Sequence, residues 1–305
     1  MGLTNLSYDW SIKDPNELII EKQISEGTAA KVYKGKFRGQ IVAVKVLKQQ
    51  MDKNQLSDFQ KEFNIYRELR SKHVVLFFGA LLKPELCMVF EFCEKGSLSN
   101  VLQSKEKLDW KRILKLSIDT CKAIGTLHSW NPPIVHRDLK SLNLLVDENY
   151  TVKVTDFGLS RFTEGKQSNI TTLGKLRGTY AYSAPELYFG ETFTTLADVY
   201  SVGVIFWEMA YRCIFGEYVM PYSEFPEFVF DFQIIIQVAK NAKRPTIPPS
   251  TPTSYKSLIE KCWSQKQQDR PGIGEVEQEL VSLYNNYKEN KLDWEKSIQI
   301  KSENK

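Results

Sequence analysis

The sequence contains few of the residues that build disulfide frameworks and zinc sites. Five cysteines and three histidines are scattered over 305 residues, and no two cysteines have the C-x-x-C spacing. An odd number of scattered cysteines does not suit a disulfide framework, and so few histidines argue against a multi-histidine metal site. This usage favours a reducing, cytoplasmic environment.

Long apolar runs are also missing. The most apolar stretch, residues 199–211, is interrupted by Glu208 and is too short to cross a bilayer, so it predicts a helix buried inside the protein. Residues 1–10 lack the basic stretch and apolar run of a secretory signal. Leu6 stands where a myristoylation signal requires Ser or Thr. We therefore expect no membrane insertion.

A strong charge of one sign is absent too. The chain has 41 basic and 37 acidic residues, which gives a net charge of +4. Such a mild excess gives no reason to expect a nucleic-acid or membrane partner. The chain is long enough for one large domain or two joined lobes with a real core.

The first part of the chain is rich in strand patterns. Short β-branched or aromatic runs at residues 18–24, 32–37 and 41–47 are separated by turns at Gly27 and at residues 38–40. A helix should follow, because four apolar residues recur at spacings of three and four. These residues are Leu56, Phe59, Phe63 and Tyr66.

The remainder is mainly helical after a further strand pattern at residues 86–92. Turn chemistry at residues 93–96 marks a lobe boundary. Beyond it, Ile113, Leu116, Ile124 and Leu127 predict one long amphipathic helix, and short strand patterns follow at 144–146 and 152–154. Residues 288–305 are charged and lack glycine, so we expect a helical extension or frayed tail outside the core.

Four short motifs occur in one order along the chain. Residues 42–45 read V-A-V-K on a predicted strand, residues 136–143 read H-R-D-L-K-S-L-N, residues 156–158 read D-F-G and residues 184–186 read A-P-E. Each is weak alone, but together and in this order they resemble the signature set of eukaryotic protein kinases. The resemblance covers residues 18–283, nearly the whole chain.

The resemblance implies an α+β, bilobal protein kinase fold. It divides the chain into an N-terminal extension at residues 1–17, a kinase domain at 18–283 and a charged C-terminal extension at 284–305. Within the domain, the small β-rich N-lobe with one regulatory helix covers residues 18–92. The hinge covers 91–96, and the larger, mainly helical C-lobe covers 97–283.

Phosphoryl transfer depends mainly on positioning and on cation placement, which explains the residue types in the motifs. The resemblance implies that Lys45 holds the ATP phosphates, that Asp138 accepts or orients the substrate hydroxyl, and that Lys140 steadies the γ-phosphate. Asn143 and Asp156 offer the hard oxygen ligands that Mg²⁺ prefers. ATP and Mg²⁺ are therefore the expected cosubstrate and metal.

A lone lysine among apolar strand residues also needs an anionic partner. Glu62 lies on the predicted helical stripe one turn before Tyr66, and Glu68 is the competing candidate. The pattern around Glu62 is more similar to the kinase family, so we expect Glu62 to pair with Lys45.

The phosphate loop departs from the family pattern G-x-G-x-x-G-x-V. Here Gly27 is retained, while Ser25 and Ala30 replace the flanking glycines and Ala29 replaces the usual aromatic residue at the tip. Glycine lets the backbone approach phosphate without an intervening side chain. Serine and alanine are small, so we expect a working but stiffer loop.

Further segments resemble the tyrosine-kinase-like group, near the mixed-lineage and Raf kinases. They are residues 75–80, 94–98, 136–143 and 269–271. The resemblance implies a gatekeeper at Phe90, hinge contacts from Glu91 and Cys93, and an ion pair between Glu186 and Arg270. The adenine ring would be sandwiched by Ile24, Val32, Ala43 and Leu145. A regulatory spine would comprise Tyr66, Phe77, His136 and Phe157, anchored by Asp198.

Two features favour serine and threonine as acceptors in a protein substrate. Lys140 follows Asp138 by two residues, and Thr179 stands where a threonine contacts both residues in such kinases. We also expect activation by phosphorylation of Thr171 or Thr172, with Ser168 a further candidate, and Arg137 as the phosphate partner. The modifying enzyme would be an upstream kinase or a second copy of this chain acting in trans.

Other readings remain open. The altered phosphate loop is compatible with an ATP-binding pseudokinase or scaffold, and the group includes members of dual or tyrosine specificity. A small-molecule kinase is a further alternative, although the A-P-E segment favours a peptide-docking surface. Residues 215–232 are rich in aromatic residues and glutamates, and none of the motifs accounts for them.

Overall fold

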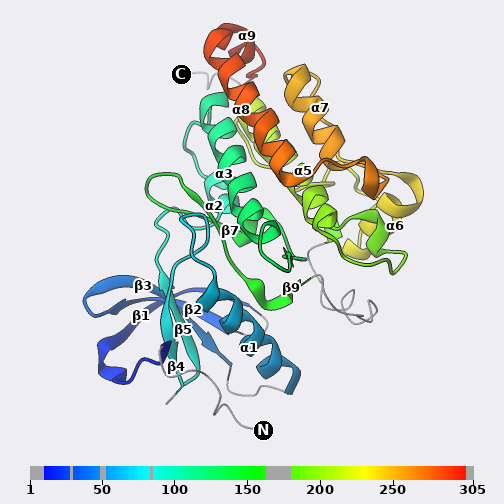
Figure 1. Ribbon diagram of the computed structural model, residues 1–305. Helices are drawn as coiled ribbons and strands as arrows, with labels where there is room; N and C mark the ends of the chain where they lie inside the picture. Colours follow the sequence, from blue (N-terminus) through cyan, green and yellow to red (C-terminus); the bar gives the residue numbers. More distant parts are fainter. Residues whose placement is uncertain (1–9, 28–29, 49–52, 83–84, 163–179, 300–305) are drawn as a thin grey trace. The chain divides into compact units, whose positions relative to one another are not determined.

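The computed structural model describes residues 10–27, 30–48, 53–82, 85–162 and 180–299. The chain forms two units (Figure 1). Unit 1 comprises residues up to Glu94 together with Thr155–Gly158, and unit 2 comprises Lys95–Val154 and the residues from Leu159 onward. The break at residues 94 and 95 falls inside the segment expected to be the hinge.

Unit 1 is built on an antiparallel sheet of five strands in the order β1-β2-β3-β5-β4. The strands are β1 (Leu18–Glu26), β2 (Ala30–Phe37), β3 (Gln40–Leu47), β4 (Phe77–Leu81) and β5 (Cys87–Glu91). Arg38 and Gly39 both have positive φ in the two-residue turn between β2 and β3, as a tight hairpin requires. The alternation of β3 buries Val42, Val44 and Val46 in a core on one face of the sheet.

The opposite face of the sheet carries Lys45 and packs against helix α1 (Lys53–Glu68). Phe59, Phe63 and Tyr66 are buried along α1, as the spacing predicts. The ring of Phe63 lies edge-on to Phe77 of β4, with centroids 5.5 Å apart. The side chains of residues 53–58, including Leu56 of the predicted stripe, lie outside the described part of the chain.

The end of the N-terminal extension belongs to this unit. Ile12 is buried in the sheet core, and its backbone N–H donates to the Ala80 carbonyl at 2.9 Å. The Trp10 ring packs on Phe77 at 5.6 Å, and the Arg70 guanidinium lies over the Trp10 ring at 4.5 Å. Residues 10–12 therefore extend the sheet beside β4.

Unit 2 is mainly helical and has two small antiparallel strand pairs. Its helices are α2 (Leu98–Gln103), α3 (Trp110–His128), α5 (Thr195–Phe215), α6 (Asp231–Asn241), α7 (Thr253–Cys262), α8 (Ile273–Glu289) and α9 (Lys291–Glu295). The pairs are β6 (Ile134–Val135) with β9 (Arg161–Phe162), and β7 (Leu144–Val146) with β8 (Val152–Val154). This confirms the bilobal kinase architecture expected from the motifs.

Two helices form the centre of unit 2. Helix α3 is capped by the Asp109 carboxylate, which accepts the Arg112 N–H, and its predicted apolar stripe is fully buried. Helix α5 is the apolar stretch of the sequence and is buried along almost its whole length. It ends at Gly216, whose φ of 74° is the left-handed conformation that commonly terminates helices. Among the described residues, no helix is long and apolar enough to cross a membrane.

The C-terminal residues correct one expectation. Residues 288–299 were expected to lie outside the core, but Trp294 and Ser297 are buried. The Trp110 indole N–H donates to Ser297 Oγ at 2.6 Å, and the rings of Trp110 and Trp294 lie edge-to-face at 5.3 Å. The charged residues of the segment lie on its exposed face, whereas a few large apolar residues on the other face pack against the core.

Candidate active site

Lys45 lies at the centre of a cluster of charges in unit 1. Its Nζ donates to Glu62 Oε1 at 2.7 Å and to Oε2 at 2.9 Å. It also lies 3.2 Å from Oδ1 of Asp156, the first residue of the D-F-G motif. Glu68, the competing candidate, instead lies 3.1 Å from its neighbour Arg67.

The cluster keeps Lys45 charged. Burial by itself lowers the pKa of a lysine, but the carboxylates of Asp156 and Glu62 outweigh it and raise the pKa of Lys45 above its ordinary value. An ammonium group that is held by two carboxylates and remains partly exposed is suited to binding a polyanion such as a triphosphate.

The backbone at Asp156 is held in an unusual conformation. Its φ is +67°, which non-glycine residues rarely adopt, and its N–H donates to the Tyr66 hydroxyl at 2.9 Å. The same hydroxyl lies 2.9 Å from Thr155 Oγ1. Such strained residues cluster at functional sites, where neighbouring contacts over-determine them.

Tyr66 also joins α1 to the aromatic residues around the cluster. Its ring lies 4.7 Å from Phe157, 4.6 Å from Phe90 and 6.1 Å from Phe77. All four rings are buried, so the position of α1, the gatekeeper candidate and the D-F-G motif are coupled by packing. His136, the fourth spine candidate, belongs to unit 2.

In unit 2, two polar side chains of the H-R-D-L-K-S-L-N motif surround Asp138. Lys140 Nζ donates to its carboxylate at 2.9 Å, and the Asn143 amide donates to the same carboxylate at 3.0 Å. The Asn143 amide also donates to the Asp138 carbonyl at 2.8 Å. These bonds fix the carboxylate of Asp138 in one orientation.

Asp198 of α5 holds the backbone of the H-R-D motif. Its carboxylate accepts the N–H groups of His136 at 2.8 Å and Arg137 at 3.0 Å, and it lies 2.9 Å from His128 Nε2. Arg137 has a φ of +70°. The buried carboxylate therefore anchors a strained turn directly before Asp138.

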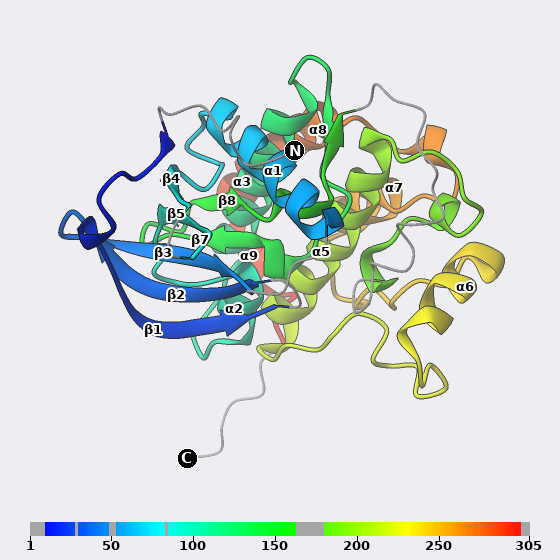
Figure 2. The same ribbon diagram turned by 90° about the horizontal axis from the view of Figure 1, so that it is seen from below.

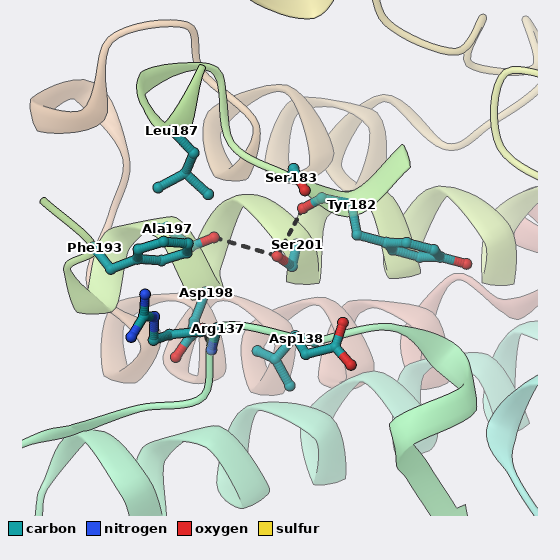
Figure 3. A pocket seen from close by; sticks show the side chains of 10 residues that line it. Arg137, Asp138, Tyr182, Ser183, Leu187, Phe193, Ala197, Asp198 and Ser201 are labelled. Carbon is teal, nitrogen blue, oxygen red and sulfur yellow. Dashed lines mark hydrogen bonds between the residues drawn. The ribbon is translucent and has the colours of Figure 1, made fainter. Parts of the chain in front are cut away.

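A pocket lies beside Asp138 in unit 2 (Figure 3). Its lining combines the H-R-D motif with Tyr182 and Ser183, which precede the A-P-E motif, and with residues at the start of α5. The side chains of Arg137 and Asp138 point in opposite directions in Figure 3. The Arg137 guanidinium lies over the Phe193 ring at 4.2 Å.

Each unit presents an oxygen donor of the kind that magnesium accepts. The described residues include no cluster of three or more His, Cys, Asp or Glu side chains that could hold a metal alone. The Asn143 amide nitrogen is directed at Asp138, so its oxygen remains as the ligand atom. Asp156 has a partly exposed carboxylate. Taken singly, both groups are hard oxygen donors, which Mg²⁺ accepts beside phosphate and water.

The nucleotide-binding candidates occupy defined positions on the sheet of unit 1. Val32 pairs with Lys45 across β2 and β3, and Ala43 pairs with Phe90 across β3 and β5, so these residues share one face. Ile24 is exposed on β1. Glu91 is the last residue of β5, and Cys93 follows the strand by two residues. Leu145 lies on β7 in unit 2.

The phosphate loop continues the hairpin of β1 and β2. Ser25 pairs with Val32, and the Gly27 N–H donates to the Ala30 carbonyl at 2.8 Å. Glu26 is tied to the end of β3 by Lys48 at 2.8 Å, and this contact lowers the pKa of its carboxyl. Thr28 and Ala29 at the tip lie outside the described residues.

The A-P-E motif is fixed by a buried ion pair. Arg270 donates to both Glu186 carboxylate oxygens at 2.7 Å. It also donates to the carbonyls of Ser264 and Leu196, so one guanidinium joins the motif to the start of α5 and to the segment before α8.

The sequence reasoning missed a second buried carboxylate near the motifs. Glu208 of α5 accepts hydrogen bonds from Ser141 Oγ at 2.9 Å and from the Tyr218 hydroxyl at 2.8 Å. Burial raises the pKa of Glu208 to about 7. The sequence does give one indication of this site. Glu208 is the one charged residue within the apolar stretch at 199–211, and a buried charge needs polar partners.

Several candidate residues lie outside the described part of the chain. They are the expected substrate contact Thr179 and the candidate phosphosites Ser168, Thr171 and Thr172.

Comparisons with known proteins agree with this geometry. The sequence profile described as protein tyrosine and serine/threonine kinase matches residues 18–280. The chain is 48% identical over 289 residues to stress-activated protein kinase alpha of Dictyostelium discoideum, covering 94% of this chain and 45% of that protein. It is 47% identical over 292 residues to a probable serine/threonine-protein kinase of the same organism, covering 95% of this chain and 29% of that protein.

A third relative is named for ankyrin repeats. The ankyrin repeat-containing protein kinase A of Dictyostelium discoideum is 39% identical over 281 residues, covering 92% of this chain and 19% of that protein. The chain thus spans less than half the length of each of these relatives. It belongs to the protein tyrosine and serine/threonine kinase family and comprises a protein kinase domain.

Proposed function

We propose that this chain transfers the γ-phosphoryl group of ATP to serine or threonine hydroxyls of protein substrates. The observation that carries the proposal is the cluster of Lys45, Glu62 and Asp156, in which an ammonium with a raised pKa is placed beside a partly exposed carboxylate. Catalysis of phosphoryl transfer requires such placed charges more than it requires covalent chemistry.

The proposed roles follow from the chemistry of each group. Lys45 binds the α- and β-phosphates, while Asp138 orients the acceptor hydroxyl and takes up its proton. Lys140, held beside Asp138, stabilises negative charge on the phosphoryl group in transfer. Asn143 and Asp156 would hold Mg²⁺, which when bound neutralises phosphate charge.

Nucleotide binding involves a further set of residues. Glu91 and Cys93 provide backbone contacts to the adenine, and Phe90 limits the depth of its site as gatekeeper. The apolar contacts come from Ile24, Val32, Ala43 and Leu145, with Gly27 beside the phosphates. These assignments rest on the positions of the residues along the kinase motifs.

Preference for serine and threonine is supported by Lys140, by the threonine at position 179 and by the names of the relatives. We assign the chain to the tyrosine-kinase-like group on the segments quoted above. We take residues 18–283 as the part that carries the kinase motifs, and residues 10–12 and 290–299 pack onto it. A cytoplasmic location is consistent with five free, buried cysteines.

Regulation by phosphorylation of Thr171 or Thr172 is part of the proposal, with Arg137 as the phosphate-binding residue and an upstream kinase or a second copy as the modifying enzyme. Arg137 stacks on Phe193, and arginine uses the edge of its guanidinium plane for phosphate while its face lies on an aromatic ring.

One observation favours a second function. Ser25 and Ala30 at the phosphate loop are compatible with a scaffold that binds nucleotide without transferring phosphate. The intact set of Lys45, Asp138, Asn143 and Asp156 supports the catalytic reading over this alternative.

The test is transfer of labelled phosphate from Mg²⁺-ATP to a generic protein substrate, with Asp138→Asn as the matched control. Loss of the Asp138 carboxylate should lower transfer by about 10²- to 10⁴-fold while nucleotide binding is retained. Equal transfer by the two proteins would refute the proposal. Phosphoamino-acid analysis of the product then distinguishes serine and threonine from tyrosine.

A further inference from the structure

Residues 217–232, which run from the end of α5 into the first turn of α6, form a surface segment with an unusual charge and apolar content. No lysine or arginine occurs between Arg212 and Lys240, whereas Glu217, Glu224, Glu227 and Asp231 are all acidic. A chain with a net charge of +4 thus has a strongly acidic segment here. The segment leads into α6, at the margin of unit 2 in Figure 2.

Three large apolar side chains are exposed at the end of this segment. Val229 is 74% exposed, Phe230 59% and Phe232 51%. The rings of Phe230 and Phe232 are stacked, with centroids 5.7 Å apart and planes inclined by 13°. We call these three residues the phenylalanine patch. Stacking joins the two rings into one apolar surface, with Asp231 between them in the sequence and Glu227 three residues before Phe230.

The patch is not needed to build α6. The helix buries Ile234, Ile235, Val238 and Ala239 on its other side. Phe230 also occupies the N-cap position, where serine, asparagine or aspartate would satisfy a helix N–H and phenylalanine does not. Phenylalanine at this position therefore makes α6 less stable than a capping residue would, and it places an aromatic ring at the surface. Such local departures from the most stable choice are expected where a residue serves binding.

The middle of the segment, residues 222–225, is attached to the rest of unit 2 by several contacts. Tyr222 is buried at a φ of +67°, and its hydroxyl lies 3.4 Å from the Tyr200 hydroxyl. Glu224 accepts the Thr246 N–H at 2.5 Å, and Lys243 lies over the Phe225 ring at 4.0 Å. These contacts fix residues 222–225, so this part of the segment does not have to be ordered when a partner binds.

The charge of the segment identifies the kind of partner. Carboxylates beside an apolar surface repel nucleic acids and anionic bilayers, and they attract lysine and arginine. We propose that the phenylalanine patch and its acidic neighbours dock a segment of another protein in which basic residues are interspersed with large apolar ones. This binding function is separate from phosphoryl transfer, and its test does not depend on catalysis.

The test uses a displayed library of random 12-residue peptides selected on the wild-type chain, with Phe230→Ser/Phe232→Ser as the counter-selection protein. Recovered peptides should be enriched in lysine or arginine together with leucine, phenylalanine or similar residues. Synthetic versions should bind the double variant at least about tenfold more weakly, as expected for loss of central aromatic contacts.

A second variant separates charge from apolar contact. Glu217→Lys/Glu227→Lys leaves the patch intact and should weaken binding of the same peptides several fold, with a smaller dependence on salt. Val281→Ser/Leu292→Ser, which removes exposed apolar residues on α8 and α9, is the matched control and should bind as wild type.

Three results would overturn the proposal. The first is that no peptides bind the wild-type chain better than the double variant, or that the selected peptides lack basic residues. The second is self-association of the wild-type chain that Phe230→Ser/Phe232→Ser abolishes, which would assign the patch to contact between copies. The third is patch-dependent binding to phosphatidylserine vesicles, which would assign it to a membrane surface.

Discussion

The charge on Lys45 depends on two carboxylates that reach it from different segments of unit 1. Glu62 comes from α1 and Asp156 from the D-F-G motif. Glu62→Gln removes one of these charges and leaves Lys45 drawn toward Asp156. We expect kcat/KM for ATP to fall by about 10²-fold, because small displacements of a positioning group have effects of that size.

Steady-state kinetics with varied ATP measure this effect, and Glu68→Gln is the matched control on the same helix. Glu68 pairs with its neighbour Arg67 and should be replaceable at little cost. A larger loss of activity from Glu68→Gln than from Glu62→Gln would contradict the assignment.

Glu208 makes stability depend on pH. Its pKa is raised from 4.5 to about 7 by burial, so the folded state favours the protonated carboxyl. The resulting stabilisation is complete below pH 4.5 and is lost as the pH rises through 7. A shift of this size corresponds to about 3 kcal/mol.

Glu208→Gln should therefore flatten the fall in unfolding free energy between about pH 5 and pH 8. Urea unfolding at several pH values measures the difference between the two proteins. The exposed Glu227→Gln serves as the control and should parallel the wild type. Parallel curves for Glu208→Gln and the wild type would show that Glu208 does not titrate in this range.

At the scale of residues, ion pairs could be predicted from the sequence where the kinase motifs and the segments similar to the family contain both partners. Lys45 with Glu62 and Glu186 with Arg270 are such cases, and both pairs are present in the structure. The hydrogen bonds of Glu208 with Ser141 and Tyr218 were not foreseen, because no sequence spacing relates α5, the H-R-D motif and the segment after α5. Such contacts are set by tertiary packing.

At the scale of elements, the ion pair of Arg270 and Glu186 joins three segments of unit 2. Arg270→Ala would leave the Glu186 carboxylate buried without its cation and would free two carbonyls. We expect a loss of about 3–5 kcal/mol of unfolding free energy. Chemical denaturation measures it.

The double variant Glu186→Gln/Arg270→Met controls for the buried charge. With both charges removed, part of the stability should return, because the unpaired carboxylate causes most of the loss. If the loss in the double variant equals the sum of the losses in Glu186→Gln and Arg270→Met, the two side chains are not coupled and the prediction is wrong.

The phosphate loop gives a prediction about nucleotide affinity. Ser25 and Ala30 lie in the paired region of β1 and β2, which restrains the backbone near the expected phosphates. Ser25→Gly/Ala30→Gly should let the backbone approach phosphate more closely and raise ATP affinity about fivefold, equivalent to about 1 kcal/mol. Calorimetric titration measures this change. Unaltered affinity would show that the substitutions are neutral.

The elements themselves were predictable to different degrees. The hairpin of β2 and β3 and the helices α3 and α5 follow from periodicity and turn chemistry in their own residues. Strand β4 was not predicted from residues 77–81. It contains Gly79 and depends on pairing with β5 and on residues 11 and 12, which lie far from it in sequence.

At the scale of the whole molecule, segments from both ends of the described chain complete the cores of the two units. Residues 10–12 extend the sheet of unit 1, and residues 290–299 close the helical core of unit 2. The sequence boundary at residue 283 falls inside α8, which continues to Glu289. Composition could not reveal this, because a few buried residues among many charged ones determine whether a segment packs.

Trp294 is the residue that attaches this segment. It is 4% exposed, it lies edge-to-face with Trp110 and Tyr287, and its indole N–H donates to Asn286 Oδ1 at 2.9 Å. Trp294→Ala should reduce the unfolding free energy by about 3–5 kcal/mol, the usual cost of removing a buried tryptophan. Leu292→Ala on the same short helix, at a site that is 79% exposed, should have almost no effect. Thermal unfolding of the two variants measures this difference. If both variants unfolded at the wild-type temperature, the segment would only extend the core and would not be part of it.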